Sequence, residues 1–450
     1  MKIKLEKVFL IFILISAFIP CPADARNFDP NYLISDRDLV ESRMSLEQIQ
    51  NFLEENKSSL ATYLTNDKDG RLKTAAEIIY QASQTHQINP QVILTLIQKE
   101  QTLITQSPQK ISQYDWATGF AAYDGQKPVQ KFKGFAIQVD QAAWRLRYFL
   151  EHPWEFRFRP NLNYRIDRYL VTPENLATAG LYNYTPHIYG NRLFWQIWQS
   201  WFQKQADQLE RSLVRVKNEI GVWLIQNGQR RPFYSRQVFL AKYSFDQVKT
   251  ISRQDLEKYE IGEPMDFPQY SLLESPDQQI FLLADGQKRP ISRTIFKEIG
   301  FHPDEVVKAS WSDLEKYSEG KPIVSPYPNG ALLQDKTTGA IYYVRDEFKY
   351  PLWSKDILLN NFPYQKIISA DPAKLNRFIS VEPVKFNDGT LIKTSGSPAV
   401  FVVVQGKRRP IYSEETFEAL GYQWENIITV SEKVLNIHPL GETLDINKLP

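Results

Sequence analysis

The pattern of apolar residues over 88–100 predicts a short buried helix. Asn89 is suited to the N-cap position and Pro90 to the first helical position. Four apolar residues then recur at helical spacing and define one face of the helix: Val92, Ile93, Leu96 and Ile97. Glu100 follows Leu96 by four residues and therefore lies on the same face. The pattern thus places a carboxyl group among apolar side chains at the end of a helix.

Glu100 in this position has the features expected of a proton donor. Apolar neighbours disfavour the ionised form of a carboxyl group, and the negative end of the helix dipole acts in the same direction, so a raised pKa is expected. A carboxylic acid that stays protonated near neutral pH is what cleavage of a glycosidic bond requires. The alternative is an exposed glutamate on a frayed last turn.

Helical periodicity extends over most of the first half of the chain. Ser45 and Gln48 have the spacing of a capping box at the start of a helix. Further apolar patterns predict helices over 74–87, 135–149 and 193–202. The stretch 107–133 shows no such period and is expected to be irregular. The first half is therefore predicted to be mainly α-helical.

The second half repeats one order of elements. Its marker prolines recur every 58 to 61 residues, at Pro232, Pro290, Pro351 and Pro410. In each copy an apolar strand and a polar turn precede the proline, and a serine and a short helix follow it. Repetition with this period predicts tandem modules. We expect four small α+β modules: module 1 (212–265), module 2 (271–323), module 3 (331–384) and module 4 (390–445).

Basic residues stand directly before the marker proline in three copies, as Arg-Arg or Lys-Arg. Two interpretations are open. The basic residues contact an anionic polymer of the cell envelope, or they belong to a solvated turn without a partner. No acid/base pair recurs in all four copies, so the modules are not expected to be catalytic.

Composition narrows the function classes. The chain has 450 residues and a net charge of +2, which does not favour nucleic acid as a partner. Its five histidines show no metal-ligand spacing, and we expect no metal centre and no cofactor. The aromatic content of 13% suits stacking on sugar rings and ordinary core packing equally.

The N-terminus has the pattern of a secretory signal peptide. Three lysines within 1–7 precede an apolar run over 8–19, and Ala23-Asp24-Ala25 fits a cleavage site. We predict a signal peptide over 1–25 and a mature chain that is secreted or held in the cell envelope. Cleavage after Ala25 removes the single cysteine, Cys21, so disulfides and thiol catalysis are not expected.

Two motifs of the first half resemble the lytic transglycosylase and goose-type lysozyme family. Residues 88–100 resemble its helix that begins after a hydrophobic-Asn-Pro step and ends in the catalytic glutamate. Residues 177–184, Ala-Thr-Ala-Gly-Leu-Tyr-Asn-Tyr, resemble its later Ala-Tyr-Asn-Ala-Gly element. The resemblance implies a lysozyme-like lytic transglycosylase domain over 27–205. The expected fold class is multidomain, with a mainly α lysozyme-like N-terminal domain followed by four small α+β repeat modules.

The resemblance also implies the residues of a cleft. Glu100 matches the catalytic acid, and Tyr182 and Asn183 match the Tyr-Asn pair beside it. Gly119 lies in the better-placed candidate for the family's Gly-Leu-Met-Gln element, and 134–138 is the other candidate.

Other residues near these motifs are less closely tied to the family. Gln101 stands where the family usually has serine. Trp116 and Tyr184 are candidates for stacking on sugar rings, with core packing as the alternative.

The implied reaction is cleavage of the β-1,4 bond between N-acetylmuramic acid and N-acetylglucosamine. Glu100 protonates the glycosidic oxygen and then acts as a base. A transglycosylase takes the proton of the sugar's own 6-hydroxyl, whereas an inverting hydrolase needs a second carboxylate about 6.5–9.5 Å away. Asp115 and Asp124 are the candidates for that carboxylate, and loop-forming aspartates are the alternative.

These observations together predict an exported peptidoglycan-cleaving enzyme, either a lytic transglycosylase or a muramidase-like glycosidase. Its expected partners are the glycan strands of peptidoglycan and, through the modules, an anionic cell-wall polymer or an envelope protein. The alternative is a catalytically inactive protein of the lysozyme fold that binds the cell wall or serves in adhesion.

Overall fold

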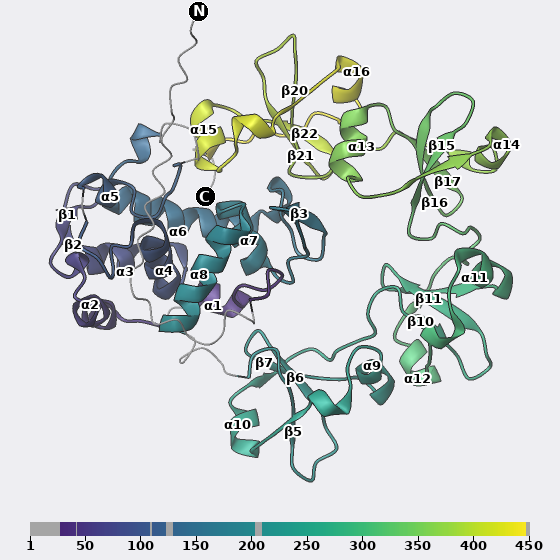
Figure 1. Ribbon diagram of the computed structural model, residues 1–450, viewed down its shortest axis with the longest axis horizontal. Helices are drawn as coiled ribbons and strands as arrows, with labels where there is room; N and C mark the ends of the chain where they lie inside the picture. The colour runs from purple at the N-terminus through teal and green to yellow at the C-terminus, as the bar shows by residue number, and fades with distance from the viewer. Residues whose placement is uncertain (1–27, 42, 109, 123–128, 203–208, 447–450) are drawn as a thin grey trace, which may run out of the picture.

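The computed structural model describes residues 28–41, 43–108, 110–122, 129–202 and 209–446. The predicted signal peptide and Asp124 lie outside these residues. The described chain forms an N-terminal unit (28–202) followed by the four modules, which are arranged around a ring (Figure 1). In this part of the chain, no helix combines the length and the apolar character needed to cross a bilayer.

The N-terminal unit consists of helices and two short hairpins. Its helices are α1 (Asp36–Val40), α2 (Leu46–Glu55), α3 (Ala75–His86), α4 (Pro90–Gln101), α5 (Ser112–Asp115), α6 (Phe135–Glu151), α7 (Leu176–Tyr184) and α8 (Ile188–Trp201). Its antiparallel hairpins pair β1 (Leu64–Asn66) with β2 (Leu72–Thr74) and β3 (Tyr164–Ile166) with β4 (Tyr169–Val171).

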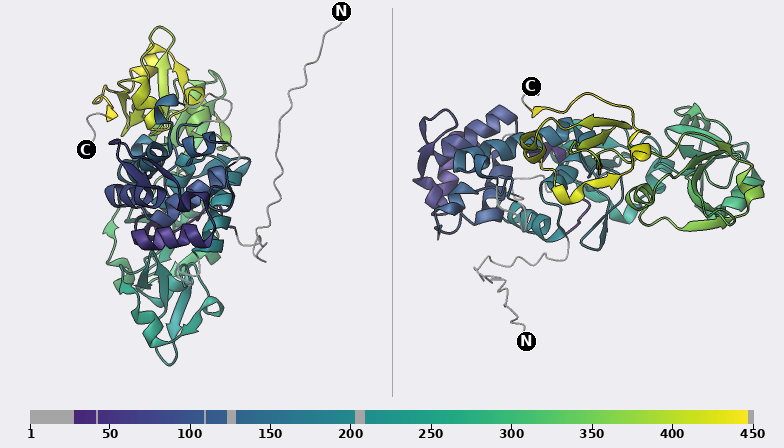
Figure 2. Two further views of the ribbon diagram at one scale, coloured as in Figure 1. Left: turned by 90° about the vertical axis from the view of Figure 1, so that its left-hand side faces the viewer. Right: turned by 90° about the horizontal axis from the view of Figure 1, so that it is seen from above.

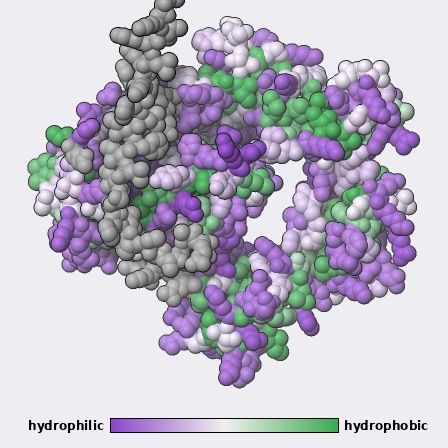
Figure 3. Space-filling view, in the orientation of Figure 1, coloured by the Kyte–Doolittle hydropathy of each residue, from purple (hydrophilic) through white to green (hydrophobic). Residues whose placement is uncertain are grey.

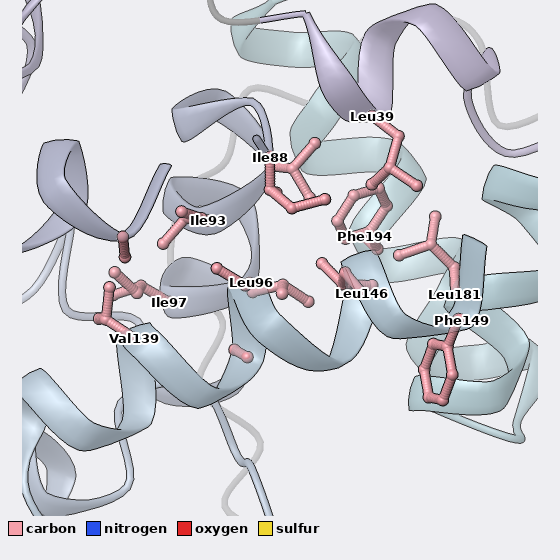
Figure 4. Packing of buried hydrophobic residues seen from close by; sticks show 14 of the residues in the cluster. Leu39, Ile88, Ile93, Leu96, Ile97, Val139, Leu146, Phe149, Leu181 and Phe194 are labelled. Atoms are coloured by element: carbon pink, nitrogen blue, oxygen red, sulfur yellow. The ribbon is translucent and has the colours of Figure 1, made fainter. Parts of the chain in front are cut away.

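Helix α4 passes through the centre of the N-terminal unit. The Asn89 side chain accepts a hydrogen bond from a first-turn amide, and Pro90 holds the first position, as the sequence predicts. All residues from Pro90 to Gln98 are buried, so the helix is surrounded by protein instead of being buried along one face. Figure 4 shows its apolar side chains among those of neighbouring helices, including Leu146 of α6 and Phe194 of α8.

The predicted fold class is wrong. The N-terminal half is not a mainly α lysozyme-like domain, because it contains both hairpins and shares its apolar core with module 4. Asp67 sets the turn of the first hairpin, since its carboxylate accepts hydrogen bonds from the amides of Asp69 and Arg71. Strands of three residues are too short to leave a periodic pattern, so helical spacing did not reveal them.

Each module is built around a mixed sheet in which a central antiparallel meander is flanked by parallel pairs. Module 1 contains β5 (Leu213–Val216), β6 (Trp223–Gln226), β7 (Gln229–Pro232), β8 (Lys249–Ile251) and β9 (Glu260–Ile261), in the order β8-β5-β6-β7-β9. Module 2 contains β10 (Leu272–Glu274), β11 (Ile280–Ala284), β12 (Gln287–Ile291), β13 (Val306–Lys308) and β14 (Ser318–Glu319), in the order β13-β10-β11-β12-β14.

The last two sheets follow the same plan. Module 3 contains β15 (Ala331–Asp335), β16 (Ile341–Arg345), β17 (Phe348–Pro351), β18 (Ile367–Ala370) and β19 (Ile379–Ser380), in the order β18-β15-β16-β17-β19. Module 4 contains β20 (Leu391–Thr394), β21 (Phe401–Val404), β22 (Lys407–Pro410) and β23 (Ile428–Val430), in the order β22-β21-β20-β23. Single bridges from Arg408 to Leu440 and from Ile411 to Leu444 replace its fifth strand.

Local signals in the sequence explain why each module folds alike. Two-residue turns with positive φ join the second and third strands in three copies, at 227–228, 285–286 and 405–406, each ending in glycine. A serine then caps the first short helix of every module: Ser235 for α9 (Arg236–Leu240), Ser292 for α11 (Arg293–Ile299), Ser354 for α13 (Lys355–Asn361) and Ser413 for α15 (Glu414–Ala419). The remaining short helices are α10 (Arg253–Glu257), α12 (Trp311–Leu314), α14 (Pro372–Leu375) and α16 (Glu432–Leu435).

The basic residues before the marker prolines hold each module together. The first cation of each copy donates to a leucine carbonyl at the end of the second short helix: Arg230 to Leu256, Lys288 to Leu314, Lys349 to Leu375 and Arg408 to Leu435. The second donates to a main-chain carbonyl further along: Arg231 to Glu263, Arg289 to Lys321 and Arg409 to Glu442. The turn is therefore not merely solvated, and its cations already have protein partners.

Module 4 closes the ring against the N-terminal unit. Figure 2 shows modules 4 and 1 at opposite ends of that unit, and Figure 3 shows the opening at the centre of the ring. Contacts between neighbouring modules include Val238 packed into the core of module 2, the ion pairs Arg289–Asp346 and Arg345–Asp285, and Ile357 packed into the core of module 4. The apolar core around α4 continues into module 4 through Leu391, Phe417, Leu420, Tyr422 and Leu444.

Candidate functional site

Glu100 lies at the last turn of α4 with its carboxyl group partly exposed. The side chain is 29% exposed, whereas the helix residues before Lys99 are buried. Its Oε1 atom is 2.5 Å from the Nζ atom of Lys99. Helix α4 thus runs from the core to the surface of the N-terminal unit, and the Glu100 carboxylate lies at its surface end.

Lys99 links Glu100 to the end of α7. The Lys99 side chain is only 5% exposed, and its ammonium group donates to the Thr185 hydroxyl at 2.7 Å as well as contacting Glu100. A buried ammonium needs such oxygen partners to offset the loss of hydration. Lys99 therefore positions the Glu100 carboxylate relative to the segment that follows α7.

Gly119 forms the opposite wall of the site. Its φ is +68°, and a Cβ atom built on it would lie 2.8 Å from both Cδ and Oε2 of Glu100. No other residue type fits this position without moving the carboxyl group, and the left-handed backbone also favours glycine. The resemblance implied that Gly119 lies near Glu100, and the structure brings the two residues into contact.

Gln138 of α6 holds the loop around Gly119 in place, a role that the sequence pattern does not indicate. Its side-chain oxygen accepts from the amide of Phe120 at 3.0 Å, and its side-chain nitrogen donates to the carbonyls of Phe120 and Phe132 at 3.0 and 2.8 Å. Thr118 donates its hydroxyl to the Gln138 carbonyl at 2.9 Å. The available signal was the resemblance of 134–138, which ends in Gln138, to the family's Gly-Leu-Met-Gln element.

Tyr184 and Arg145 connect the same loop to module 4. The Tyr184 hydroxyl donates to the Thr118 carbonyl at 2.9 Å. The Arg145 guanidinium lies 3.7 Å from the centre of the Phe120 ring and donates to the carbonyls of Glu418 and Ala419 at the end of α15. The loop beside Glu100 is therefore supported from α6, α7 and module 4.

Tyr182 does not belong to the site. Its side chain is fully buried, and its hydroxyl donates to the Pro30 carbonyl at 2.9 Å. Burial also raises the pKa of its phenol above the usual value. A side chain without exposed surface cannot touch a glycan, so the predicted substrate contact at Tyr182 is wrong.

Asn183 and Trp116 also have packing partners. The Asn183 side chain accepts from the amide of Phe158 at 3.0 Å and donates to its carbonyl at 2.8 Å, which fixes the segment before β3. Trp116 is half-buried and packs against the cluster of Phe120, Phe132 and Ala419. For Trp116 the structure favours the core interpretation over stacking on a sugar.

Asp115 has a cationic partner. It ends α5, and its carboxylate pairs with Lys133 at 3.4 Å. The other candidate carboxylate, Asp124, lies in the segment 123–128 outside the described residues.

Comparison with known proteins bears on the N-terminal unit. Residues 32–209 match the family model described as LasA, N-terminal domain. The match spans less than half of the chain and ends before the modules. No curated protein matches the chain.

Solved structures give only weak likenesses. A chain of "Structure of the periplasmic assembly from the ESX-5 inner membrane complex, C1 model" is 11% identical, with 53% of this chain and 95% of that chain covered and a TM-score of 0.14. A chain of "Structure of EccB3 dimer from the ESX-3 core complex" is 12% identical, with 52% and 98% covered and a TM-score of 0.14. At these TM-scores the likeness carries no argument about fold or function.

Proposed function

We propose that this protein is an exported peptidoglycan-cleaving enzyme of the lytic transglycosylase or muramidase type, with Glu100 as its general acid and base. The observation that supports the proposal most directly is the placement of Glu100. Its carboxyl group emerges from the core at a fixed position, between Lys99 on one side and Gly119 on the other. The export step rests on the sequence pattern at the N-terminus.

The two carboxyl oxygens of Glu100 have different neighbours. Oε1 contacts Lys99, and Oε2 lies against Gly119 on the partly exposed side. In the reaction, protonated Glu100 gives its proton to the glycosidic oxygen as the bond to the sugar C1 breaks. In a transglycosylase the Glu100 carboxylate then accepts the proton of the 6-hydroxyl of the same sugar, whereas in an inverting hydrolase a second carboxylate activates the attacking water.

The modules are proposed to hold the enzyme at the wall or at an envelope partner. The catalytically inactive alternative is a wall-binding or adhesion protein. It is favoured by the burial of Tyr182 and by the ion pair that engages Glu100.

Peptidoglycan digestion separates these possibilities. Protein lacking residues 1–25 is incubated with purified peptidoglycan, and the soluble products are analysed by mass spectrometry. Glu100→Gln is expected to lower product release at least about 100-fold. Glu55→Gln is the matched control, because Glu55 also ends a helix but is exposed, and it should retain full release.

The products decide the remaining questions. Equal release by the original chain and Glu100→Gln, or no release by either, contradicts the enzyme proposal. Products with 1,6-anhydro ends identify a transglycosylase, whereas reducing ends identify a hydrolase.

A further inference from the structure

A cavity of about 730 Å³ lies where three parts of the chain meet. Its walls come from the segment around β3 in the N-terminal unit (156–165), the end of α13 in module 3, and residues 387–391 at the start of module 4. Glu100 does not line it. The cavity exists only because the ring is closed, since each wall belongs to a different part of the chain.

The cavity is rich in positive charge. Of the described residues that line it, Arg157, Arg159 and Arg165 are cationic, and Asp388 is the single carboxylate. Asp388 pairs with Arg159 at 3.3 Å, while the buried Nε atom of Arg159 has no hydrogen-bond partner within the described chain. Arg157 and Arg165 are exposed and form no ion pair with the described residues. The guanidinium groups of Arg157 and Arg165, which lack a carboxylate partner among the described residues, favour an anionic ligand.

The remaining lining suits a sugar better than a small inorganic anion. The exposed ring of Tyr364 lies at the rim, where the Arg165 guanidinium is 5.8 Å from its centre, and amide side chains such as Asn163 and Asn426 share the surface. Aromatic faces and amides bind the apolar faces and the hydroxyl or acetamido groups of sugars. A volume of about 730 Å³ also far exceeds what one phosphate ion fills and lies in the usual range for larger ligands.

We propose that this cavity binds an acidic oligosaccharide, whose carboxylates pair with Arg157 and Arg165 and whose sugar rings contact Tyr364. Binding there bridges the N-terminal unit to modules 3 and 4, and it does not depend on cleavage at Glu100.

The test uses titration calorimetry on the chain lacking residues 1–25 and carrying Glu100→Gln, so that no probe is consumed. The acidic probes are tetragalacturonate and a tetrasaccharide of alternating N-acetylglucosamine and N-acetylmuramic acid. Chitotetraose and inorganic phosphate are the neutral and the small anionic probes. At least one acidic probe should bind at least about 10-fold more tightly than chitotetraose and phosphate, and more weakly as salt rises.

Arginine variants locate the binding. The double variant Arg157→Ala/Arg165→Ala should weaken binding of the acidic probe at least about 10-fold. Arg168→Ala is the matched control, because Arg168 is an exposed arginine of the same hairpin that does not line the cavity, and it should leave binding unchanged. Failure of both acidic probes to bind overturns the proposal. So does equal binding of chitotetraose or phosphate, or an unchanged affinity in the double variant.

Discussion

The N-terminal unit meets the ring at two junctions that differ in kind. At the junction with module 1, Arg211 pairs with Asp29 and Glu174 through side chains that are between 34% and 41% exposed. At the junction with module 4, Arg409 pairs with Glu155, which is 4% exposed, and apolar residues of both parts share one core. Exposed ion pairs contribute little to stability, whereas buried pairs and cores are costly to break. The last module is therefore joined to the N-terminal unit more firmly than the first.

The largest effect is expected from breaking the buried pair at the module 4 junction. Glu155 contacts Arg409 and also accepts from the Tyr148 hydroxyl at 2.6 Å. Glu155→Ala removes the carboxylate that Arg409 and Tyr148 share, leaving Arg409 with the Glu442 carbonyl, and should lower the free energy of unfolding by about 3–5 kcal/mol. Urea denaturation measures the change. A loss below about 1 kcal/mol would mean that this junction is no stronger than the exposed one.

The second largest loss of stability is expected when the pH is lowered, because His438 of module 4 is buried in its neutral form. His438 is buried, its Nε2 accepts from the amide of Phe386 at 3.0 Å, and burial lowers its pKa to about 4, with Lys385 and Arg408 adding to the shift. The unfolded chain binds a proton near pH 6.5, so it holds more protons than the folded chain between pH 6.5 and 4. Stability should fall as the pH drops through this window, by about 3 kcal/mol in total.

The acid effect is checked by denaturation at several pH values with His438→Leu beside the original chain. The variant should lose the part of the pH dependence that falls between pH 6.5 and 4. Identical pH profiles for the two chains would rule His438 out as the cause.

A smaller effect on stability is expected at the loop around Gly119, which lies beside Glu100 and is supported by module 4. Gly119→Ala should lower the free energy of unfolding by about 1–2 kcal/mol, because an alanine with φ near +68° is strained. It should also reduce the proposed cleavage of peptidoglycan at least about 10-fold, because the added methyl group displaces the Glu100 carboxyl.

Gly70→Ala provides the comparison for Gly119. Gly70 has a φ of +80° and no atom within 4 Å of an added Cβ. The Gly70→Ala variant should lose about as much free energy of unfolding as Gly119→Ala, but it should cleave peptidoglycan as the original chain does. Equal activity in both variants would remove Gly119 from the site.

The smallest effect is expected at the module 1 junction. Glu174→Ala removes one exposed partner of Arg211, which keeps Asp29. The free energy of unfolding should fall by less than about 1 kcal/mol, and less still at high salt. A loss as large as that of Glu155→Ala would erase the contrast between the two junctions.

The sequence predicted correctly the features that depend on local signals, which are the starts and caps of helices. Asn89 and Pro90 begin α4 as predicted, and a serine caps the first short helix in each of the four modules. These features depend on neighbours within a few residues, which a sequence displays directly.

Long-range contacts explain what the sequence did not reveal. The predicted stripe on α4 is instead a helix buried from Pro90 to Gln98, because α3, α6 and α8 pack around it. Tyr182 matches a motif of the family, yet its hydroxyl donates to the carbonyl of Pro30, which lies 152 positions earlier in the chain. Lys99 was visible as a neighbour of Glu100, but its burial and its bond to Thr185 depend on where α7 ends.

Closure of the ring has a consequence for the order of folding during synthesis. The N-terminal unit ends at residue 202, but its core includes Leu444 of module 4. Ribosomes add about 5–20 residues per second, so the chain waits roughly 12 to 48 seconds for the missing part of that core. During this time an apolar surface stays uncovered, and a chaperone can engage it before the fold is complete.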